Sequence, residues 1–162
     1  KARKEPWFDN TIFIFTGDHG QITYDVYDMP ITYHHVPFIV YCPKLLSPAV
    51  NHHLGFQPDI TATVAALLKL NYVNTGFGVN VFDEARPFVF FSADDKIGCV
   101  TDDDLFFYHL LNSNEKHLYR YTNMSRTDLY STHKTRADSI YQQVQSLYTS
   151  ARYIIHKNYL NF

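Results

Sequence analysis

Short runs of apolar, β-favouring residues recur within the first 95 residues, at Thr11–Phe15, Val36–Tyr41 and Phe88–Ser92. Uninterrupted apolar runs are typical of strands that are buried on both faces of a parallel sheet. Between the second and third runs, Pro58–Leu70 places apolar residues on one helical face, and its proline suits the first turn of a helix. This order predicts an α/β fold with a mainly parallel sheet and flanking helices.

The pattern changes after Ser92, where shorter runs alternate with polar turns and predict a small antiparallel meander. These runs are Lys96–Val100, Leu105–Leu110 and His117–Tyr121. Apolar residues then recur every three or four positions over residues 134–158, which predicts a long C-terminal helix with one packing stripe. We therefore expect residues 1–95 to be part of an α/β domain. Residues 96–162 would form the meander and helix, in the same domain or in a subdomain.

The N-terminal residues Lys1–Glu5 are rich in basic side chains and are followed by Pro6, a combination typical of the last turn of a helix. A natural chain rarely begins there. We therefore interpret the sequence as a piece of a longer protein.

Composition restricts the class of function. The net charge is −2 and basic residues do not cluster beyond Lys4, which argues against a nucleic-acid-binding surface. No apolar run reaches the roughly 18 residues of a transmembrane helix, so the chain itself is expected to be soluble. The nine histidines leave room for metal chemistry, and the two cysteines, Cys42 and Cys99, allow one disulfide or none.

The strongest local candidate for chemistry is Thr16–Gly20, which reads Thr-Gly-Asp-His-Gly and directly follows the first predicted strand. Open α/β sheets bind ligands at the carboxyl ends of their strands. Asp18 offers a carboxylate and His19 an imidazole, a pair that suits zinc or manganese. Neighbouring strand residues point to opposite faces, so both can reach one ion only if the backbone turns sharply, and we expect Gly17 and Gly20 to permit this. The five residues alone are equally compatible with a solvated Asp-His pair in a glycine-flanked turn.

Further segments extend this motif into an ordered series. In chain order they are Trp7–Thr11, Thr16–Gly20, His35–Pro43, Gln57–Ile60, Gly76–Phe82 and His117–Tyr121. The series resembles the C-terminal half of the sulfatase family of the alkaline phosphatase superfamily, closest to its lipoteichoic acid synthase-like phosphoglycerol transferases. In that family, Asp-Asn-Thr, a strand and Gly-Asp-His-Gly are followed by a Val-Pro-Phe strand and a Gln-x-Asp-Ile helix start. Arg120 departs from the Leu-Tyr-Asp-Leu strand found near the end of many sulfatases.

The resemblance implies a metal-dependent hydrolase or transferase that acts on phosphate or sulfate esters. Asp18 and His19 match the family's late metal-ligand pair, and the ion would be Mn or Zn, with Ca or Mg as alternatives. The family's nucleophile, a Thr, Ser or modified Cys, comes from an earlier strand, so we expect it upstream and assign no catalytic residue in this chain. Cys42 follows the Asp-His pair, whereas the family's Cys-x-Pro-x-Arg nucleophile precedes it. The isolated chain is therefore expected to carry half of an active site and to be inactive.

His34 and His35 precede the second predicted strand, near the sheet edge where Asp18 is expected. We consider them candidates for contact with the substrate's anionic group or with a second metal, and a surface or packing role is the alternative. His52 and His53 are weaker candidates of the same kind. For Asp102–Asp104 a solvated turn is favoured over a calcium site, because the EF-hand pattern is absent.

By the same resemblance, membrane helices would anchor the parent protein, with its catalytic domain on the extracytoplasmic side of a bacterial cell membrane. Its substrate would be a phosphate or sulfate ester, with a glycerophospholipid as one candidate. An apolar strand at Thr11–Phe15 that lacks its sheet partners would favour self-association of the fragment. The alternative function is a non-catalytic binding or structural module that has kept this fold without its chemistry.

Overall fold

The computed structural model describes residues 1–23 and 26–159, with side chains as far as residue 157. The chain forms two compact units, which we call unit 1 and unit 2. Unit 1 consists of Lys1–Tyr24 and Pro30–Arg86, and unit 2 consists of Asp25–Met29 and Pro87–Phe162. Among the described helices, none combines the length and the apolar character needed to cross a membrane.

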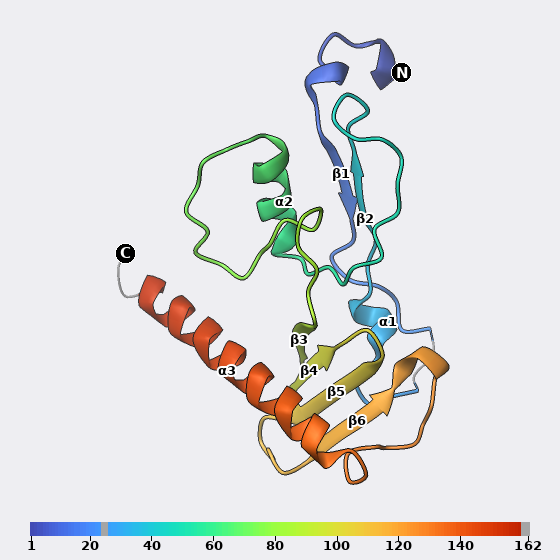
Figure 1. Cartoon of the computed structure of the whole chain (residues 1–162), viewed down its shortest axis with the longest axis vertical. Coiled ribbons are helices and arrows are strands. Elements are labelled where there is room, and N and C mark those ends of the chain that lie inside the picture. Colours follow the sequence, from blue (N-terminus) through green and yellow to red (C-terminus); the bar gives the residue numbers. More distant parts are fainter. Residues whose placement is uncertain (24–25, 160–162) are drawn as a thin grey trace. The chain divides into compact units, whose positions relative to one another are not determined.

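Unit 1 contains a two-stranded antiparallel sheet and two α-helices (Figure 1). Its elements are two 3-10 turns (Ala2–Lys4 and Phe8–Asn10), β1 (Phe13–Thr16), α1 (Ile31–His34), β2 (Phe38–Tyr41) and α2 (Asp59–Leu67). The helix predicted over Pro58–Leu70 is thus confirmed, although it ends earlier. Lys69 adopts a left-handed backbone with φ 53°, which cannot continue an α-helix.

The mainly parallel sheet that we expected is wrong for the described residues. Strand β1 pairs with β2 in an antiparallel register, with Phe13 opposite Tyr41 and Thr16 opposite Phe38. The third predicted strand does not pair with either of them. It forms an antiparallel hairpin with Lys96–Val100, and Asp94, with φ 53°, lies in the turn. An uninterrupted apolar run indicates burial on both faces but carries no information on strand direction.

Burial of the first strand on both faces is also not observed. Phe15 of β1 and Ile39 of β2 lie opposite each other in the register, on the same face of the sheet. Their side chains are 55% and 54% exposed, respectively. The two-stranded sheet of unit 1 therefore presents paired apolar side chains to solvent.

We expect this apolar pair to promote self-association of the 162-residue chain, because exposed apolar strands without further sheet partners pair readily. Sedimentation velocity should show species larger than the monomer, and Phe15→Ser combined with Ile39→Ser should shift the distribution toward the monomer. Leu111→Ser is a matched control, since this leucine is 91% exposed but lies in unit 2. A monomer at every concentration tested would contradict the expectation.

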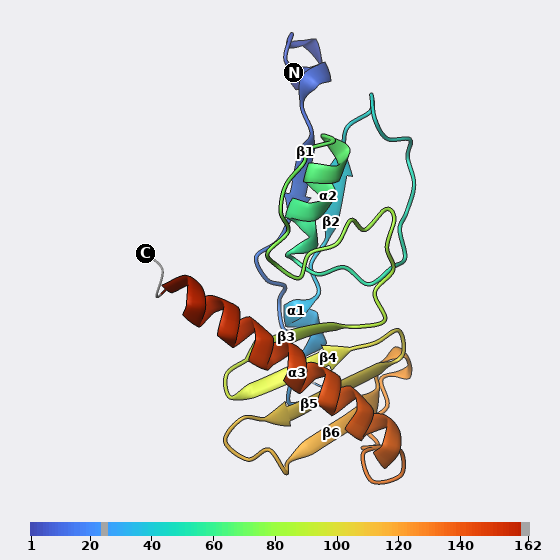
Figure 2. The ribbon, with the colours of Figure 1, turned by 60° about the vertical axis from the view of Figure 1, so that its left-hand side comes forward.

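Unit 2 is a four-stranded antiparallel meander with the order β3-β4-β5-β6, and α3 lies across one of its faces (Figure 2). Its elements are β3 (Val89–Ala93), β4 (Lys96–Val100), β5 (Asp104–His109), β6 (Lys116–Arg120), a 3-10 turn (Tyr121–Asn123) and α3 (Lys134–Tyr159). The predicted meander and C-terminal helix are confirmed. Ala137 and Val144 of the predicted helical stripe are fully buried against the sheet residues Phe106 and Leu118.

The opposite face of this sheet is covered by residues 26–29. Met29 is fully buried, and it lies so close to Gly98 of β4 that a Cβ on the glycine would come 2.5 Å from the Met29 sulfur. The Tyr27 ring packs 4.8 Å from the Tyr119 ring, centroid to centroid. Both faces of β4 and β5 are therefore buried, which explains why apolar residues run through these strands without alternation.

Unit 2 should lose stability in alkali. Burial raises the pKa of the Tyr108 phenol to about 12, and it also raises the pKa values of Tyr27, Tyr119 and Tyr121. Unfolded tyrosines ionise near their ordinary pKa of 10.0. The stability that these neutral phenols contribute is complete below pH about 10 and is lost as the pH rises toward 12.

Urea unfolding between pH about 9 and about 12 should show this loss, together with a rise of tyrosinate absorbance on unfolding. Tyr108→Phe should weaken the pH dependence, because phenylalanine has no proton to lose. A free energy of unfolding that is constant across this range would contradict the assignment.

Candidate functional site

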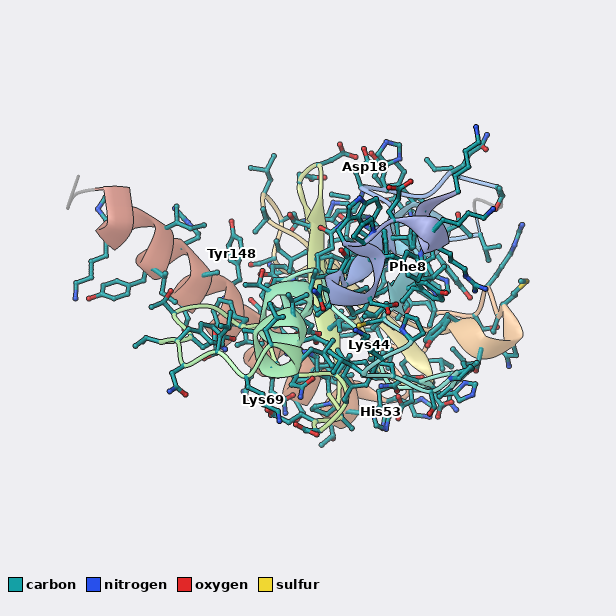
Figure 3. The ribbon with its side chains drawn as sticks, turned by 90° about the horizontal axis from the view of Figure 1, so that it is seen from above. Phe8, Asp18, Lys44, His53, Lys69 and Tyr148 are labelled. Atoms are coloured by element: carbon teal, nitrogen blue, oxygen red, sulfur yellow. The ribbon has the colours of Figure 1, made fainter. Side chains whose placement is uncertain are left out.

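The loop Gly17–Gly20 directly follows β1 and holds the predicted metal-binding pair. The side chain of Asp18 is 91% exposed and that of His19 is 55% exposed. Figure 3 shows Asp18 at the edge of the molecule. The Nε2 atom of His19 lies 4.0 Å from Oδ2 of Asp18. The two side chains therefore approach one another on a solvent-facing surface of unit 1.

The imidazole of His19 is fixed by two contacts. Its Nδ1 lies 2.8 Å from the carbonyl oxygen of Gly20, and its ring stacks on the ring of Tyr33 with centroids 4.9 Å apart. Because a carbonyl oxygen only accepts hydrogen bonds, Nδ1 must carry the proton. In the neutral ring the lone pair is then on Nε2, the nitrogen that faces Asp18.

Hydrogen bonds with α1 and with Gln57, which lies two residues before α2, hold the backbone of the loop. The N–H of Gly20 donates to the carbonyl of Tyr33 at 2.7 Å, and the side-chain amide of Gln57 donates to the carbonyls of Gly17 (3.4 Å) and Asp18 (3.3 Å). A Cβ at Gly20 would lie 2.1 Å from the carbonyl oxygen of Thr32.

This geometry corrects the role that we expected of the glycines. Neither Gly17 nor Gly20 has a positive φ, so the turn does not depend on their conformational freedom. Gly20 is needed because the backbone of α1 comes too close for any side chain.

The electrostatics of the loop favour an ionised Asp18. The N–H of His19 donates to Oδ1 of Asp18 at 2.9 Å, and this hydrogen bond is the largest cause of a lowered pKa for the carboxyl group. A second contribution comes from the backbone N–H of Asp18 itself. The group is therefore in the charge state that a metal ligand requires at neutral pH.

Asp18 and His19 fit a divalent cation as a partial site. Two ligands at about 2.0–2.1 Å from a tetrahedral ion lie about 3.4 Å apart, so a small rotation of the exposed Asp18 side chain would bring its oxygen into range. Within the described residues, no third His, Cys, Asp or Glu ligand atom lies within 4.8 Å of both. The pair supplies two of the three or four protein ligands of a usual site.

His34 and His35 lie beside this loop but have different environments. His34 ends α1, is partly buried and meets the Tyr33 ring edge-on at 5.4 Å. Burial lowers the pKa of His34, so its imidazole is neutral at pH 7 and offers a hydrogen bond rather than a positive charge. His35 is exposed, and its backbone N–H donates to the carbonyl of Ile31. Their role as substrate contacts stays a prediction.

Neither cysteine is placed to act as a nucleophile. Cys42 and Cys99 are both free thiols and both buried. Cys42 directly follows β2 and is 5% exposed. Burial raises the pKa of the Cys99 thiol to about 12, so at neutral pH it is protonated and unreactive.

A buried ion pair of unit 1 was not predicted from the sequence. Asp59, at the start of α2, has no exposed surface, and its two carboxylate oxygens accept from Nε of Arg86 at 3.1 and 3.0 Å. The second Arg86 donor, Nη2, bonds to Asp59 and to the carbonyl of Phe77. The backbone N–H groups of Phe56 and Val79 also donate to Asp59, each at 2.8 Å. The only sequence signal was the Asp of the Gln-x-Asp-Ile segment.

Asp59→Ala should destabilise unit 1 by about 3–5 kcal/mol, because it leaves the guanidinium of Arg86 and two backbone donors without their acceptor. Urea unfolding of unit 1, followed by the fluorescence of Trp7, measures the change. Glu84→Ala removes one exposed carboxylate of the same unit and should change stability by less than about 0.5 kcal/mol. If the two substitutions had equal effects, the anchoring role of Asp59 would be refuted.

Comparisons with known proteins bear on both units. A sequence model of the sulfatase family matches residues 1–70. Among curated proteins, no match was found. One similar structure is a protein in the alkaline phosphatase superfamily from Vibrio parahaemolyticus, with a TM-score of 0.66 and 20% sequence identity. That similarity covers 78% of this chain and 31% of the other.

A second similar structure is that of BT4656 in complex with its substrate D-glucosamine-2-N,6-O-disulfate, with a TM-score of 0.73 and 13% identity. This similarity covers 92% of our chain and 37% of BT4656. The chain therefore spans about a third of the length of each of the two similar structures. Residues 1–70 include the Asp18–His19 loop. The expected resemblance is thus confirmed: residues 1–70 match the sulfatase family model, and the fold is similar to that of a protein in the alkaline phosphatase superfamily.

Proposed function

We propose that this chain forms the C-terminal part of a metal-dependent enzyme that cleaves or transfers phosphate or sulfate esters, with Asp18 and His19 as two ligands of its catalytic ion. The ion is Mn or Zn, with Ca or Mg as alternatives. The observation that carries the proposal is that the sulfatase match includes the loop in which an ionised carboxylate faces an imidazole nitrogen that bears a lone pair.

The chain's own residues would orient the ligands. The Gly20 carbonyl fixes the tautomer of His19, Tyr33 fixes its ring plane, and Gln57 holds the loop backbone. When bound, a divalent ion would stabilise the negative charge that develops on the ester's oxygens during the reaction. His34 or His35 would donate a hydrogen bond to those oxygens.

The nucleophile is proposed to come from outside this chain. Two ligands and no accessible thiol in the described residues are consistent with a half-site that is completed by other parts of a longer protein. The structure of BT4656 was solved with a sulfated substrate, which supports the ester class.

We also propose a more specific reaction and location for the parent protein. The motif series favours a phosphoglycerol transferase that acts on a glycerophospholipid, in a membrane-anchored parent on the extracytoplasmic side of a bacterial membrane. A non-catalytic binding or structural module is the second candidate, and the high exposure of Asp18 favours it, because a carboxylate in an assembled metal centre is normally buried and paired.

The purified chain should hydrolyse neither 4-nitrophenyl sulfate nor bis(4-nitrophenyl) phosphate above background with Mn²⁺ or Zn²⁺ present. A site of this kind without its nucleophile loses several orders of magnitude in rate. The assay is release of 4-nitrophenol by the native chain and by Asp18→Ala. Turnover that requires both the metal and Asp18 would show that the chain holds a nucleophile and would refute the half-site proposal.

Binding of Mn²⁺ at the Asp18–His19 loop should nevertheless be detectable. Paramagnetic Mn²⁺ should broaden the backbone amide NMR signals of Gly17–Gly20, and Asp18→Ala should abolish this broadening. Asp9→Ala is the control, because Asp9 is an exposed carboxylate of the same unit outside the loop. Absence of broadening at the loop in the native chain would favour the binding module.

A further inference from the structure

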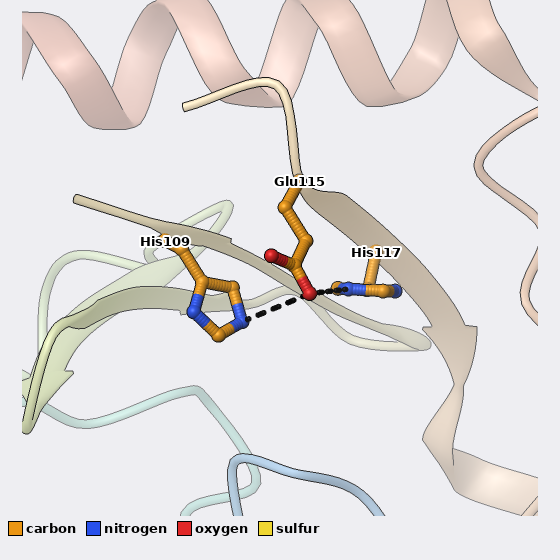
Figure 4. A group of neighbouring side chains, drawn as sticks. All are labelled: His109, Glu115 and His117. Carbon is orange, nitrogen blue, oxygen red and sulfur yellow. Dashed lines mark ion pairs between the residues drawn. The ribbon is translucent and has the colours of Figure 1, made fainter. Parts of the chain in front are cut away.

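A second group of metal-ligating side chains lies in unit 2, far along the sequence from the Asp18–His19 loop. His109 ends β5, Glu115 directly precedes β6, and His117 is the second residue of β6. Phe107 pairs with His117, and the N–H of His109 donates to the carbonyl of Glu115 at 3.2 Å. This register places the three side chains on one face of the sheet (Figure 4).

Alternation along the strands separates this group from the hydrophobic core. Lys116, between Glu115 and His117, points to the opposite face, where its ammonium lies 3.9 Å from the centroid of the Tyr141 ring. Tyr108 also faces α3, within the core. The three candidate ligands therefore belong to the face that residues 26–29 cover.

The distances suit an ion between the three side chains. The Oε1 atom of Glu115 lies 3.8 Å from Nε2 of His109 and 3.9 Å from Nε2 of His117, and the three ligand atoms all lie within 4.8 Å of one another. These separations are too long for hydrogen bonds. They are about 0.5 Å longer than those of ligands around a tetrahedral zinc ion, a gap that rotation of the half-exposed Glu115 side chain can close.

The other nitrogen of each imidazole is held by a carboxylate. Nδ1 of His117 lies 2.8 Å from Asp128, whose second oxygen accepts from the backbone N–H groups of Leu118 and Tyr130. Nδ1 of His109 lies 3.2 Å from Asp95. A carboxylate on Nδ1 orients the ring and leaves the Nε2 lone pair for a metal, which is the usual outer arrangement of histidine ligands.

A candidate fourth ligand, Asp28, belongs to the segment that covers this face; its side chain is 68% exposed and lies outside the group of three. Oδ2 of Asp28 lies 3.7 Å from Nε2 of His109 and 3.2 Å from the ammonium of Lys96. Four carboxylates thus surround the two imidazoles, and Lys96 is the one ammonium within 4.0 Å of any of them among the described residues. The excess of negative charge favours a divalent cation at the centre.

We propose that His109, Glu115 and His117, with Asp28 as the fourth ligand, bind a zinc-class divalent transition metal. Two imidazoles with carboxylates form a ligand set typical of zinc. With Asp28 bound, the ion ties residues 26–29 to the β5–β6 hairpin, so its role is structural. This site is independent of the Asp18–His19 pair and of the proposed esterase function.

The test is a Zn²⁺ titration of the chain against a chromophoric chelator, carried out on the native protein and on Asp18→Ala. Both should bind one Zn²⁺ tightly. His109→Asn combined with His117→Asn should weaken this affinity at least about 100-fold, and Asp128→Asn about 10–100-fold, since it removes the carboxylate that orients His117. His156→Asn, on the exposed surface of α3, is the matched control and should bind as the native chain does.

Co²⁺ gives an independent readout, because tetrahedral coordination produces visible absorption that an ordinary ion-pair network does not. The absorption should persist in Asp18→Ala and be lost in Glu115→Gln, a variant that retains the size of the side chain. If circular dichroism shows that the double histidine variant does not fold, the Zn²⁺ affinity and Co²⁺ absorption of Glu115→Gln provide the test instead. Unchanged Zn²⁺ affinity in that variant, or loss of tight binding in Asp18→Ala alone, would overturn the proposal.

Discussion

The buried carboxylate of Asp59 is the constraint on which the arrangement of unit 1 depends. It is fully buried and accepts hydrogen bonds from a guanidinium and from two backbone N–H groups that lie 23 positions apart along the chain, at Phe56 and Val79. It thereby connects the start of α2, the segment Phe77–Val79 and Arg86. Gln57, two residues before Asp59, is the residue that holds the Asp18–His19 loop.

The two units are stabilised in different ways. The buried apolar residues of unit 1 are few and mostly small, namely Phe8, Cys42, Ala62, Ala65 and Val81. Unit 2 instead has aromatic and aliphatic residues packed on both faces of its sheet. Since apolar burial supplies most of the free energy of folding, a unit with so little of it depends more strongly on its polar anchors. Damage to Asp59 would therefore reach the Asp18–His19 loop through the backbone at Gln57.

The sequence predicted the positions of the elements well because hydrophobic periodicity and turn residues are local signals. Lys96–Val100 and the start of the last helix at Lys134 were predicted without error. The parallel direction predicted for the first three strands was wrong, since pairing depends on long-range contacts that an apolar run such as Thr11–Phe15 does not encode. Asp104 was taken for part of a solvated turn, yet it is 1% exposed and paired with Arg136, a partner 32 residues away.

The same distinction applies to the sites. Asp18 and His19 could be proposed from the sequence because they are adjacent and follow a strand, whereas Tyr33 and Gln57 are brought to them by tertiary structure alone. His109, Glu115 and His117 were missed because their convergence requires the register of the β5–β6 hairpin, which spacing in the sequence does not reveal. His117 was noticed only as part of a strand.

The assignment of Asp25–Met29 to unit 2 makes the two units interleaved rather than consecutive. No single cut in the chain separates them: a chain beginning at Pro87 would lack Met29, and the sheet surface at Gly98 would be exposed to water. Neither unit could therefore be exchanged as one continuous segment of sequence by recombination. A sequence inserted between residues 1 and 86 must preserve the path through Met29 if the sheet of the other unit is to keep both of its faces covered.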